Sequence, residues 1–301
     1  MPTAAYCTCL RPENIREKES CAGGRWQTCG MCDTIGPMID AQRLVGTHDI
    51  LFITLDTLRY DVASDALRRG LTPNLARLLP EGWEMRHSPG SFTYAAHQAF
   101  FAGFLPTPVT PGKHPRLFAL RFHGSETTTD RTCVFDAPDI VTGLAQRGYH
   151  TICVGGVGFF NKESPLGQVL PGLFAESHWS PELGVTHPRS TENQVALACA
   201  RLTEVPANRR VFLFLNVSAI HQPNCMFLPG ATADSLASHA AALAYVDRHL
   251  PPLWHALRQR APLLVIICSD HGTAYGEDGY HGHRLAHPVV WTVPYAEFVL
   301  E

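Results

Sequence analysis

Residues 49–56 read Asp-Ile-Leu-Phe-Ile-Thr-Leu-Asp, written DILFITLD, and this stretch decides the fold class. Its apolar part has the length of a strand and contains isoleucine and phenylalanine, which favour strands. Apolar residues at successive positions, rather than at alternate ones, are typical of a parallel strand that is buried on both faces. The stretch therefore predicts a buried strand with the carboxylate of Asp56 at its carboxyl end.

Helix and strand patterns alternate after this stretch. Residues 71–82, LTPNLARLLPEG, predict a helix that begins at Thr72 and Pro73, because Thr caps a first turn and Pro fits the first helical position. The alternation predicts an α/β fold, with a mainly parallel central sheet covered by helices on both faces. Further helices are expected within 141–148 and 239–260, the latter one helix or two around Pro251-Pro252, and strands within 149–154, 209–218 and 262–268.

The composition indicates a globular chain. Of 301 residues, 45% are apolar and 17% are charged, which is enough to bury a sizeable core. The net charge of −3, without a long run of one sign, predicts no nucleic-acid or membrane partner. No apolar run approaches the roughly 18 residues of a membrane span, and the first residues lack the apolar core of a secretory signal. We expect a cytoplasmic protein, and the sequence does not indicate its oligomeric state.

The cysteines divide the chain at residue 38. Residues 1–37 form a Cys-rich extension that ends at Gly36-Pro37, and residues 38–301 form the expected catalytic domain. The CxC and CxxC pairs of the extension can converge on zinc or an iron–sulfur cluster. Alternatively, the extension is flexible, or Met38 is the functional beginning. Five cysteines lie in the extension, Cys7, Cys9, Cys21, Cys29 and Cys32, and the other five are expected to be core residues or spare thiols, Cys133, Cys153, Cys199, Cys225 and Cys268.

Polar residues follow three of the apolar runs. Asp56 follows the first run, His221 follows FLFLNVSAI, and Asp270 and His271 follow LLVIIC. Ligand sites in parallel sheets lie beyond the carboxyl ends of the strands. An aspartate after a strand is often only a turn or cap residue, but three such ends with metal-ligating side chains predict a metal site at this edge.

A series of motifs resembles the alkaline phosphatase and sulfatase superfamily between residues 49 and 294. The motifs are LDTLRYD, TPNLARL, a hydroxyl residue before GFLP, GLAQRGYHTICVGG, IHQPN and SDHG, in that order. Within the superfamily, the chain looks closest to sulfatase-like hydrolases and to phosphoethanolamine and lipoteichoic-acid transferases. The resemblance implies an alkaline phosphatase-like fold and a divalent metal, zinc or manganese, with one ion favoured and two possible.

The resemblance assigns the central site residues. Asp56 matches the acidic metal ligand at the end of the first strand, Asp270 and His271 of SDHG match further ligands, and Thr93 matches the nucleophile. True sulfatases make formylglycine from Cys or Ser followed by x-Pro-x-Arg. Here Thr93 is followed by Tyr-Ala-Ala-His, which argues against an aldehyde-hydrate mechanism.

A threonine hydroxyl is a poor nucleophile at neutral pH, so Thr93 requires an adjacent metal ion to stabilise its alkoxide. The same residue also suits the N-cap of a helix over AAHQAFFAG. The two roles are compatible, because a helix N-terminus favours negative charge.

His221 and His283 match two further histidines of the superfamily, and they would bind either a second metal or the phosphoryl oxygens. A second ion needs about three protein ligands. Asn216 stands near the position where two-zinc phosphatases have an aspartate, so the second metal lacks an acidic ligand.

Other polar residues have weaker assignments. His97 is a candidate for contact with the reacting group, because it lies four residues after Thr93. His287 and His281 are candidate ligands or phosphate contacts, with structural hydrogen bonding as the alternative. Arg59 and Asp61 are expected to form structural bonds or to orient Asp56, and the glycines Gly272, Gly276 and Gly279 are expected to allow tight turns.

The site predicts a metal-dependent hydrolase of phosphate, phosphonate or sulfate esters that acts through a covalent threonine intermediate. Unmodified Thr93 favours phosphate over sulfate. One alternative is a phosphoryl transferase or mutase on the same scaffold. The other is a noncatalytic metal-binding member of a biosynthetic cluster, against which a nucleophile among metal ligands argues.

Overall fold

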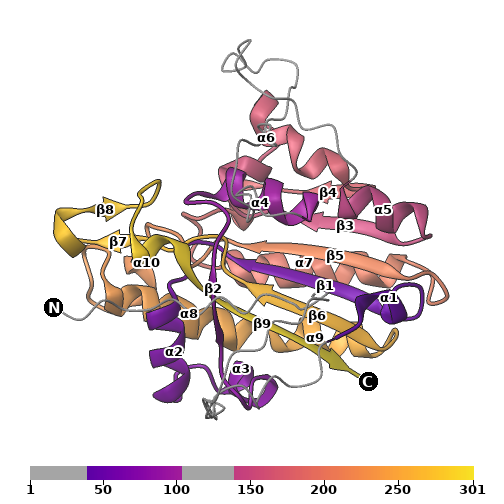
Figure 1. The fold of residues 1–301 in the computed structure, drawn as a ribbon, viewed down its shortest axis with the longest axis horizontal. Helices are drawn as coiled ribbons and strands as arrows, with labels where there is room; N and C mark the ends of the chain where they lie inside the picture. The colour runs from indigo at the N-terminus through magenta and orange to yellow at the C-terminus, as the bar shows by residue number, and fades with distance from the viewer. Residues whose placement is uncertain (1–38, 104–138) are drawn as a thin grey trace, which may run out of the picture. The chain divides into compact units, whose positions relative to one another are not determined.

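The strand 49–55 lies in the middle of a seven-stranded sheet, with the strand order β2-β9-β6-β1-β5-β3-β4 (Figure 1). The structure is a computed structural model and describes residues 39–103 and 139–301. The Cys-rich extension of residues 1–37 and Cys133 lie outside the described residues.

The strands of the described residues form the main sheet and a separate hairpin. In the main sheet they are β1 Asp49–Leu55, β2 Glu84–His87, β3 His150–Val154, β4 Glu176–His178, β5 Val211–Val217, β6 Leu263–Cys268 and β9 Thr292–Leu300; the hairpin is β7 Ala274–Tyr275 with β8 His281–Gly282. The helices are α1 Ala41–Leu44, α2 Tyr60–Arg68, α3 Pro73–Leu78, α4 Thr93–Ala102, α5 Ile140–Gln146, α6 Pro165–Val169, α7 Ser190–Glu204, α8 Leu236–His249, α9 Pro251–Arg258 and α10 Pro288–Trp291.

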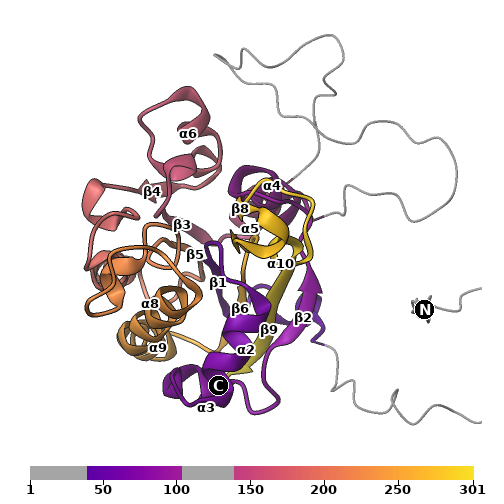
Figure 2. The ribbon, with the colours of Figure 1, turned by 90° about the vertical axis from the view of Figure 1, so that its left-hand side faces the viewer.

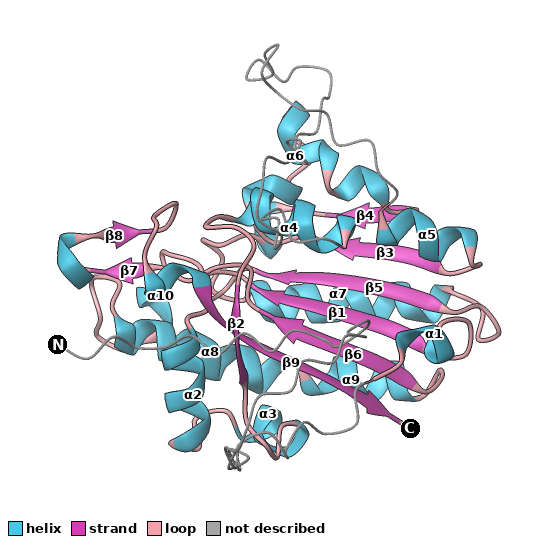
Figure 3. Cartoon of the chain, in the orientation of Figure 1, coloured by secondary structure: helices cyan, strands magenta, loops and turns pink. Residues whose placement is uncertain are grey.

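The sheet is mainly parallel, as the sequence predicts. β1 pairs in parallel with β5 and β6, and β3 extends the parallel part to β4. β9 pairs antiparallel with β6, and β2 pairs antiparallel with β9 (Figure 3). The carboxyl ends of β1, β5 and β6 therefore meet at one edge of the sheet.

Helices cover both faces of the sheet, which explains why all seven residues of β1 are buried. Leu51, Ile53 and Leu55 pack with α2, α7, α8 and α9, whereas Ile50 and Phe52 pack with α4 and α5. Figure 2 shows α8 and α9 on one side of the strands and α4 on the other. The α/β fold with two covered faces is confirmed.

The structure corrects the helix prediction for residues 71–82 and decides between one helix and two in residues 239–260. The helix predicted over 71–82 is α3, and it ends at Leu78. Thr72 makes no side-chain cap bond; instead the Asp247 carboxylate of α8 accepts the backbone N–H groups of Asn74 at 3.1 Å and Leu75 at 2.7 Å. Asp247 is distant in sequence, so local propensity could not reveal it.

The segment 239–260 contains two helices that meet at Pro251.

None of the helices in the described part of the chain is both long enough and apolar enough to cross a lipid bilayer.

Candidate active site

Asp56, Asp270 and His271 form a buried cluster at the carboxyl ends of β1 and β6. One ligand atom from each of the three side chains lies within 4.8 Å of the other two. The Nε2 atom of His271 is 3.5 Å from Asp270 Oδ2 and 3.9 Å from Asp56 Oδ1. β1 and β6 are neighbouring parallel strands, so the acids that follow them lie side by side. The structure thus brings together the three ligands that the resemblance implies.

Thr93 completes the cluster from α4. Its Oγ1 atom lies 3.3 Å from Asp56 Oδ2 and 3.3 Å from His271 Nε2. Thr93 is the first residue of α4, and Phe92 stands at the N-cap position without a side-chain cap bond. The N-cap prediction for Thr93 is therefore wrong, because Phe92 occupies that position. The Thr93 hydroxyl contacts Asp56 and His271 and does not cap the helix.

The backbone fixes the tautomer of His271. Its Nδ1 atom is 2.9 Å from the carbonyl oxygen of Gly272, which only accepts hydrogen bonds, so Nδ1 donates. Burial lowers the pKa of His271, which keeps the ring neutral. The lone pair on Nε2 therefore points at the two carboxylates and Thr93, as metal ligation requires.

Two carboxylate oxygens in the cluster have no hydrogen-bond donor among the described residues, Asp56 Oδ1 and Asp270 Oδ2. The other oxygen of each group is satisfied: Asp270 Oδ1 accepts the N–H groups of Thr57 and His271 at 3.2 and 3.0 Å. Buried carboxylate oxygens without donors are costly unless a cation compensates them. Two such oxygens and one imidazole nitrogen fit a divalent ion.

Burial dominates the charge state of both acids. It raises the pKa of Asp56 to about 6, with a further increase from the nearby charge of Asp270. It raises the pKa of Asp270 to about 7. Perturbed carboxylates of this kind are typical of functional sites.

A series of hydrogen bonds runs from Asn216 through Thr54 and His97 to the backbone of the nucleophile, Thr93. His97 Nδ1 donates to the Thr93 carbonyl at 2.7 Å, so in the neutral ring Nε2 accepts from the Thr54 hydroxyl at 3.0 Å. Burial lowers the pKa of His97 to about 3, so the ring stays neutral. Thr54 in turn accepts from Asn216 Nδ2 at 3.1 Å. Both ring nitrogens of His97 are thus engaged in hydrogen bonds, and its contact with the reacting group stays a prediction.

Asn216 contacts Asp56, one of the candidate metal ligands. Its Nδ2 atom lies 3.4 Å from Asp56 Oδ2, and its Oδ1 atom accepts the N–H of Val157 at 3.0 Å. The amide thus offers Asp56 a donor, whereas an aspartate there would offer a second negative charge. The orientation of Asn216 gives no support to a second ion at this position.

His221 and His283 lie beside the cluster. The His283 ring centroid is 4.6 Å from that of His271 and 5.6 Å from that of His221. His221 Nδ1 donates to the carbonyl of Gln222, which leaves Nε2 unprotonated in the neutral ring. Burial lowers the pKa of His283 to about 3. The structure brings both residues to the site. That they bind either a second metal or the phosphoryl oxygens stays a prediction.

The other predicted histidines lie elsewhere. His287 accepts the N–H of Val289 at the start of α10, and its Nε2 atom is 3.1 Å from Asp278 Oδ2. His281 is exposed in β8, where it pairs with Tyr275. His287 therefore makes the hydrogen bonds of the structural alternative, and the role of His281 stays a prediction.

Arg59 connects the loop after β1 to the hairpin loop. Its guanidinium bonds to Asp61 with Nε–Oδ1 at 2.9 Å, to the carboxylate of Glu277 and to the carbonyl of Thr273 at 3.4 Å. Arg59 thus makes structural contacts between two loops, which is one of the two roles that the sequence predicts for it.

The three glycines of the loop have two different roles. Gly276 and Gly279 have φ angles of 127° and 82°, as tight turns require. Gly272 is needed for close approach, because a Cβ atom there would lie 2.0 Å from the carbonyl oxygen of Val289.

A cavity of about 360 Å³ opens onto the cluster at Thr93. His221, His283 and Arg284 line it together with apolar side chains from residues 157–185. Asp56, Asp270 and His271 have no exposed surface, so Thr93 separates the buried ligands from the open cavity.

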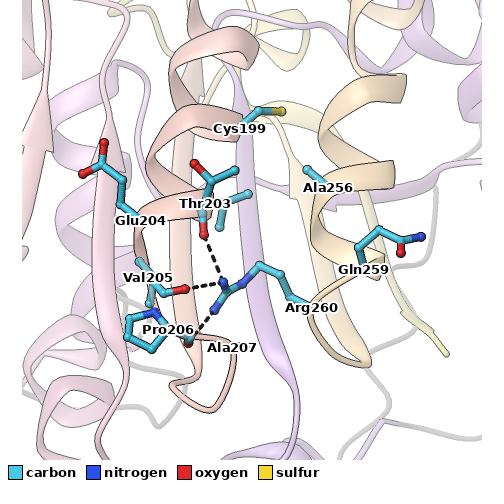
Figure 4. A pocket seen from close by; sticks show the side chains of 10 residues that line it. Cys199, Thr203, Glu204, Val205, Pro206, Ala207, Ala256, Gln259 and Arg260 are labelled. Atoms are coloured by element: carbon cyan, nitrogen blue, oxygen red, sulfur yellow. Dashed lines mark hydrogen bonds between the residues drawn. The ribbon is translucent and has the colours of Figure 1, made fainter.

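A larger cavity of about 540 Å³ lies at the opposite edge of the sheet, beside α7 and α9 (Figure 4). Arg260 is its prominent charged group, and it donates to the carbonyls of Leu202 at 3.0 Å and Val205 at 2.8 Å and to Asp49 Oδ2 at 3.2 Å. Since these bonds hold the ends of α7 and β1, Arg260 has a structural role.

Three residues of the site were missed by sequence reasoning. Thr54 faces α4 because alternate residues of a strand point to the same face, so the strand pattern could have indicated it. Thr57 has a φ angle of 64° and aims its N–H at Asp270, and nothing in the sequence signals this backbone. Arg284 also has a positive φ, of 68°, at the rim of the cavity.

Comparisons with known proteins concern the family and the fold of the chain. A family model described as Sulfatase matches residues 48–295. A search of curated protein sequences finds no match. The solved structures that resemble the chain include three transferase or synthase structures at 12–16% identity, a level at which the likeness concerns the fold.

The soluble domain of lipooligosaccharide phosphoethanolamine transferase A from Neisseria meningitidis has a TM-score of 0.60 at 16% identity, over 84% of this chain and 76% of that chain. The C-terminal periplasmic domain of EcEptC from Escherichia coli, in complex with Zn, has a TM-score of 0.56 at 12% identity, over 85% and 73%. The lipoteichoic acid synthase LtaP from Listeria monocytogenes has a TM-score of 0.54 at 14% identity, over 84% and 65%.

Proposed function

This chain belongs to the sulfatase family, and from that membership we propose that it cleaves phosphate esters with the hydroxyl of Thr93 as the nucleophile. One observation carries the proposal: Thr93 Oγ1 lies 3.3 Å from both Asp56 Oδ2 and His271 Nε2 and borders an open cavity. A hydroxyl between metal-ligating atoms and a cavity is placed to attack a bound substrate.

Asp56, Asp270 and His271 would hold a divalent ion, because their free oxygens and the Nε2 lone pair converge. Zinc and manganese suit this mixed set of carboxylates and imidazole. Such an ion supplies positive charge that stabilises the deprotonated hydroxyl of Thr93. A zinc complex of a structural neighbour supports zinc as the first metal to test.

In the first step, Thr93 Oγ1 bonds to phosphorus and the bond from phosphorus to the alcohol oxygen breaks, giving phosphothreonine. The hydroxyl proton of Thr93 ends on the released alcohol, and Asp56 Oδ2 is its first acceptor at 3.3 Å. In the second step, water oxygen bonds to phosphorus, the bond from phosphorus to Thr93 Oγ1 breaks, and one water proton returns to Thr93 as phosphate is released. His221 and His283 would contact the phosphoryl oxygens from the cavity side.

Phosphate and phosphonate esters are preferred over sulfate esters in this proposal. Threonine has no route to formylglycine, and the x-Pro-x-Arg pattern after position 93 is absent. A small-molecule ester is the expected substrate, and the proposed cytoplasmic location is testable by cell fractionation.

Transfer of the phosphoryl group to an alcohol is the second candidate. The observation that favours it is the likeness of the fold to two phosphoethanolamine-transferase-type domains and a lipoteichoic acid synthase. In that case the same phosphothreonine would form, and an acceptor hydroxyl would replace water in the second step.

The test is turnover of para-nitrophenyl esters of phosphate, phenylphosphonate and sulfate, and of the phosphate bis-ester, by the zinc- and manganese-loaded protein, with Thr93→Ala and Thr93→Ser in parallel. We expect phosphate turnover that Thr93→Ala abolishes and Thr93→Ser partly retains. Unchanged turnover in Thr93→Ala, or a protein that retains no divalent ion, would overturn the assignment. Product that appears only after an alcohol is added would favour transfer over hydrolysis.

A further inference from the structure

The cavity beside Thr93 has one apolar wall. Phe159 and Leu166 form this wall together with Val157 and Val185. The ring of Phe159 is held in place by Tyr94, at 5.5 Å between ring centroids, and by Phe92, at 6.3 Å. Phe159 therefore packs against both residues that flank Thr93 in sequence, and this part of the wall lies beside the nucleophile.

Leu166 is the exposed member of this wall, with 36% of its surface accessible. It lies in the short helix α6, whose first turn is fixed by the Ser164 side chain accepting the N–H of Gly167 at 3.0 Å. Covering a leucine that a fixed helix presents to a cavity is favourable, because apolar surface leaves water. The substrate group next to phosphorus is thus expected to be apolar.

The charges of the cavity are of one sign. Arg284 is the only permanently charged side chain among the described lining residues, and none of these residues is an aspartate or glutamate. Its guanidinium carbon lies 5.8 Å from the centroid of Phe92, so the positive charge also stands beside the nucleophile. An ammonium group in this cavity would lose its hydration, find no carboxylate partner among these residues and be repelled by Arg284.

We propose that the cavity selects a dianionic phosphate monoester, or the matching phosphonate, whose alcohol part is compact, uncharged and apolar. The phosphoryl group would lie between Thr93 and Arg284, and the alcohol part would cover Leu166 and Phe159. A volume of about 360 Å³ is near the lower end of ligand cavities, which suits one ring or one branched alkyl group. This inference rests on the proposed function, and it sets this chain apart from the phosphoethanolamine transferases that share its fold.

The sharpest test compares 3,3-dimethylbutyl phosphate with phosphocholine, because the two have the same shape and differ by a carbon in place of a charged nitrogen. We expect kcat/KM to be at least about tenfold higher for the uncharged ester. Leu166→Ala should lower kcat/KM for 3,3-dimethylbutyl phosphate by about tenfold, from the lost apolar contact, and should lower it less for methyl phosphate, which has less apolar surface to cover. Leu236→Ala is the matched control, since Leu236 is an exposed leucine outside this cavity.

Arg284→Gln should lower kcat/KM for the uncharged phosphate esters to a similar degree, because it removes the charge that attracts the phosphoryl group. It should lower kcat/KM for phosphocholine less, because it also removes the repulsion of the ammonium group. Equal rates for the two isosteres, a preference for phosphocholine, or equal effects of Leu166→Ala and Leu236→Ala would overturn the inference while leaving the proposed function intact.

Binding of the non-hydrolysable 3,3-dimethylbutylphosphonate and 2-aminoethylphosphonate, measured by calorimetry, gives a readout that does not depend on turnover. Tighter binding of the apolar phosphonate, weakened by Leu166→Ala, supports the cavity assignment even if Thr93 proves inactive. Equal binding of the two phosphonates contradicts it.

Discussion

At the residue scale, the site is a set of buried polar side chains in which some atoms have no hydrogen-bond partner among the described residues. Asp56 and Asp270 each keep one oxygen without a donor among the described residues, and the Nε2 atom of His271 faces them. The other carboxylate oxygen of each acid and the Nδ1 atom of His271 are hydrogen-bonded to a nearby backbone group or side-chain amide. The atoms that could bind an ion are thus without hydrogen-bond donors, and the other polar atoms hold the side chains in place through hydrogen bonds.

The raised pKa values of Asp56 and Asp270 predict how an ion affects stability. The folded chain holds these protons more tightly than the unfolded chain, in which the value is about 3.8. Their contribution to stability is therefore fully present below pH 3.8 and is lost as the pH rises through 6 to 7. Zinc should raise the melting temperature more at pH 8 than at pH 5, as thermal unfolding with and without the ion will measure.

Asp270→Asn is the control for this prediction. Without zinc at pH 8, the variant should be at least as stable as the original chain, because a buried negative charge is removed. With zinc, its melting temperature should not rise. An equal rise for both proteins would show that the ion binds elsewhere.

His97 is expected to act as a positioning residue. His97→Phe preserves the aromatic packing against Phe160 and Phe214 but removes the bonds to Thr93 and Thr54. We expect kcat to fall by about 10- to 100-fold, the usual effect of losing a bond that orients a site. KM for para-nitrophenyl phosphate should change by less than about twofold, since His97 does not line the cavity.

The comparison variant is His255→Phe, in α9 and remote from the site. A large increase of KM in His97→Phe would instead indicate direct substrate contact, as the sequence alone suggests.

At the scale of elements, three loops that follow strands form the site, and contacts between the loops hold it. Arg59 after β1 bonds to Glu277 and Thr273 after β6. Gly272 packs against α10, where its N–H donates to the carbonyl of Val290 at 2.6 Å. The loop after β6 that carries Asp270 and His271 is thus fixed from both sides.

Gly272→Ala should therefore disturb the site. The added methyl group would lie 2.0 Å from the carbonyl oxygen of Val289 and 3.2 Å from the Arg59 side chain, which leaves it little room to move. We expect a loss of stability of about 1–3 kcal/mol and weaker zinc binding, measured by urea unfolding and zinc titration.

Gly143→Ala provides the matched control in α5, where no atom lies within 4 Å of the added Cβ. This change should raise stability by about 0.5–1 kcal/mol, because alanine favours a helix interior. A Gly272→Ala variant as stable as Gly143→Ala would refute the close packing of the loop.

The cap of α3 by Asp247 predicts a second effect on stability. Asp247→Ala leaves the N–H groups of Asn74 and Leu75 without their acceptor. We expect a loss of about 1–2 kcal/mol in urea unfolding, with zinc affinity unchanged because α3 does not reach the site. Asp65→Ala, at an exposed ion pair of α2, should cost less than about 1 kcal/mol.

At the scale of the whole molecule, every described element and every site residue lies in one compact unit, residues 39–301. A chain that begins at Met38 is therefore expected to fold and bind zinc at the Asp56 cluster with the affinity of the full chain. Calorimetry of both chains tests this. If the shortened chain loses the ion, residues 1–37 contribute to the site.

The sheet and the buried ligands could be predicted because their signals are local in sequence. Apolar runs such as DILFITL mark buried parallel strands, and polar residues at their ends must meet at one edge. The family resemblance added Thr93, which no strand pattern identifies. The cap by Asp247, the orientation of Asn216 and the backbone of Thr57 depend on contacts between distant segments, so neither propensity nor spacing could reveal them. The antiparallel strands β2 and β9 also lack a distinctive alternation, since Pro294 interrupts β9.

The separation of the buried ligands from the cavity by Thr93 has a kinetic consequence. Asp56, Asp270 and His271 have no exposed surface, so an ion exchanges with solvent only past the nucleophile or when the loops open. Extraction by a chelator should therefore be slow and nearly independent of chelator concentration, with a rate set by local opening of the protein. A phosphoryl group on Thr93 would close that exit, so the enzyme would hold its ion most firmly in the middle of its own catalytic cycle.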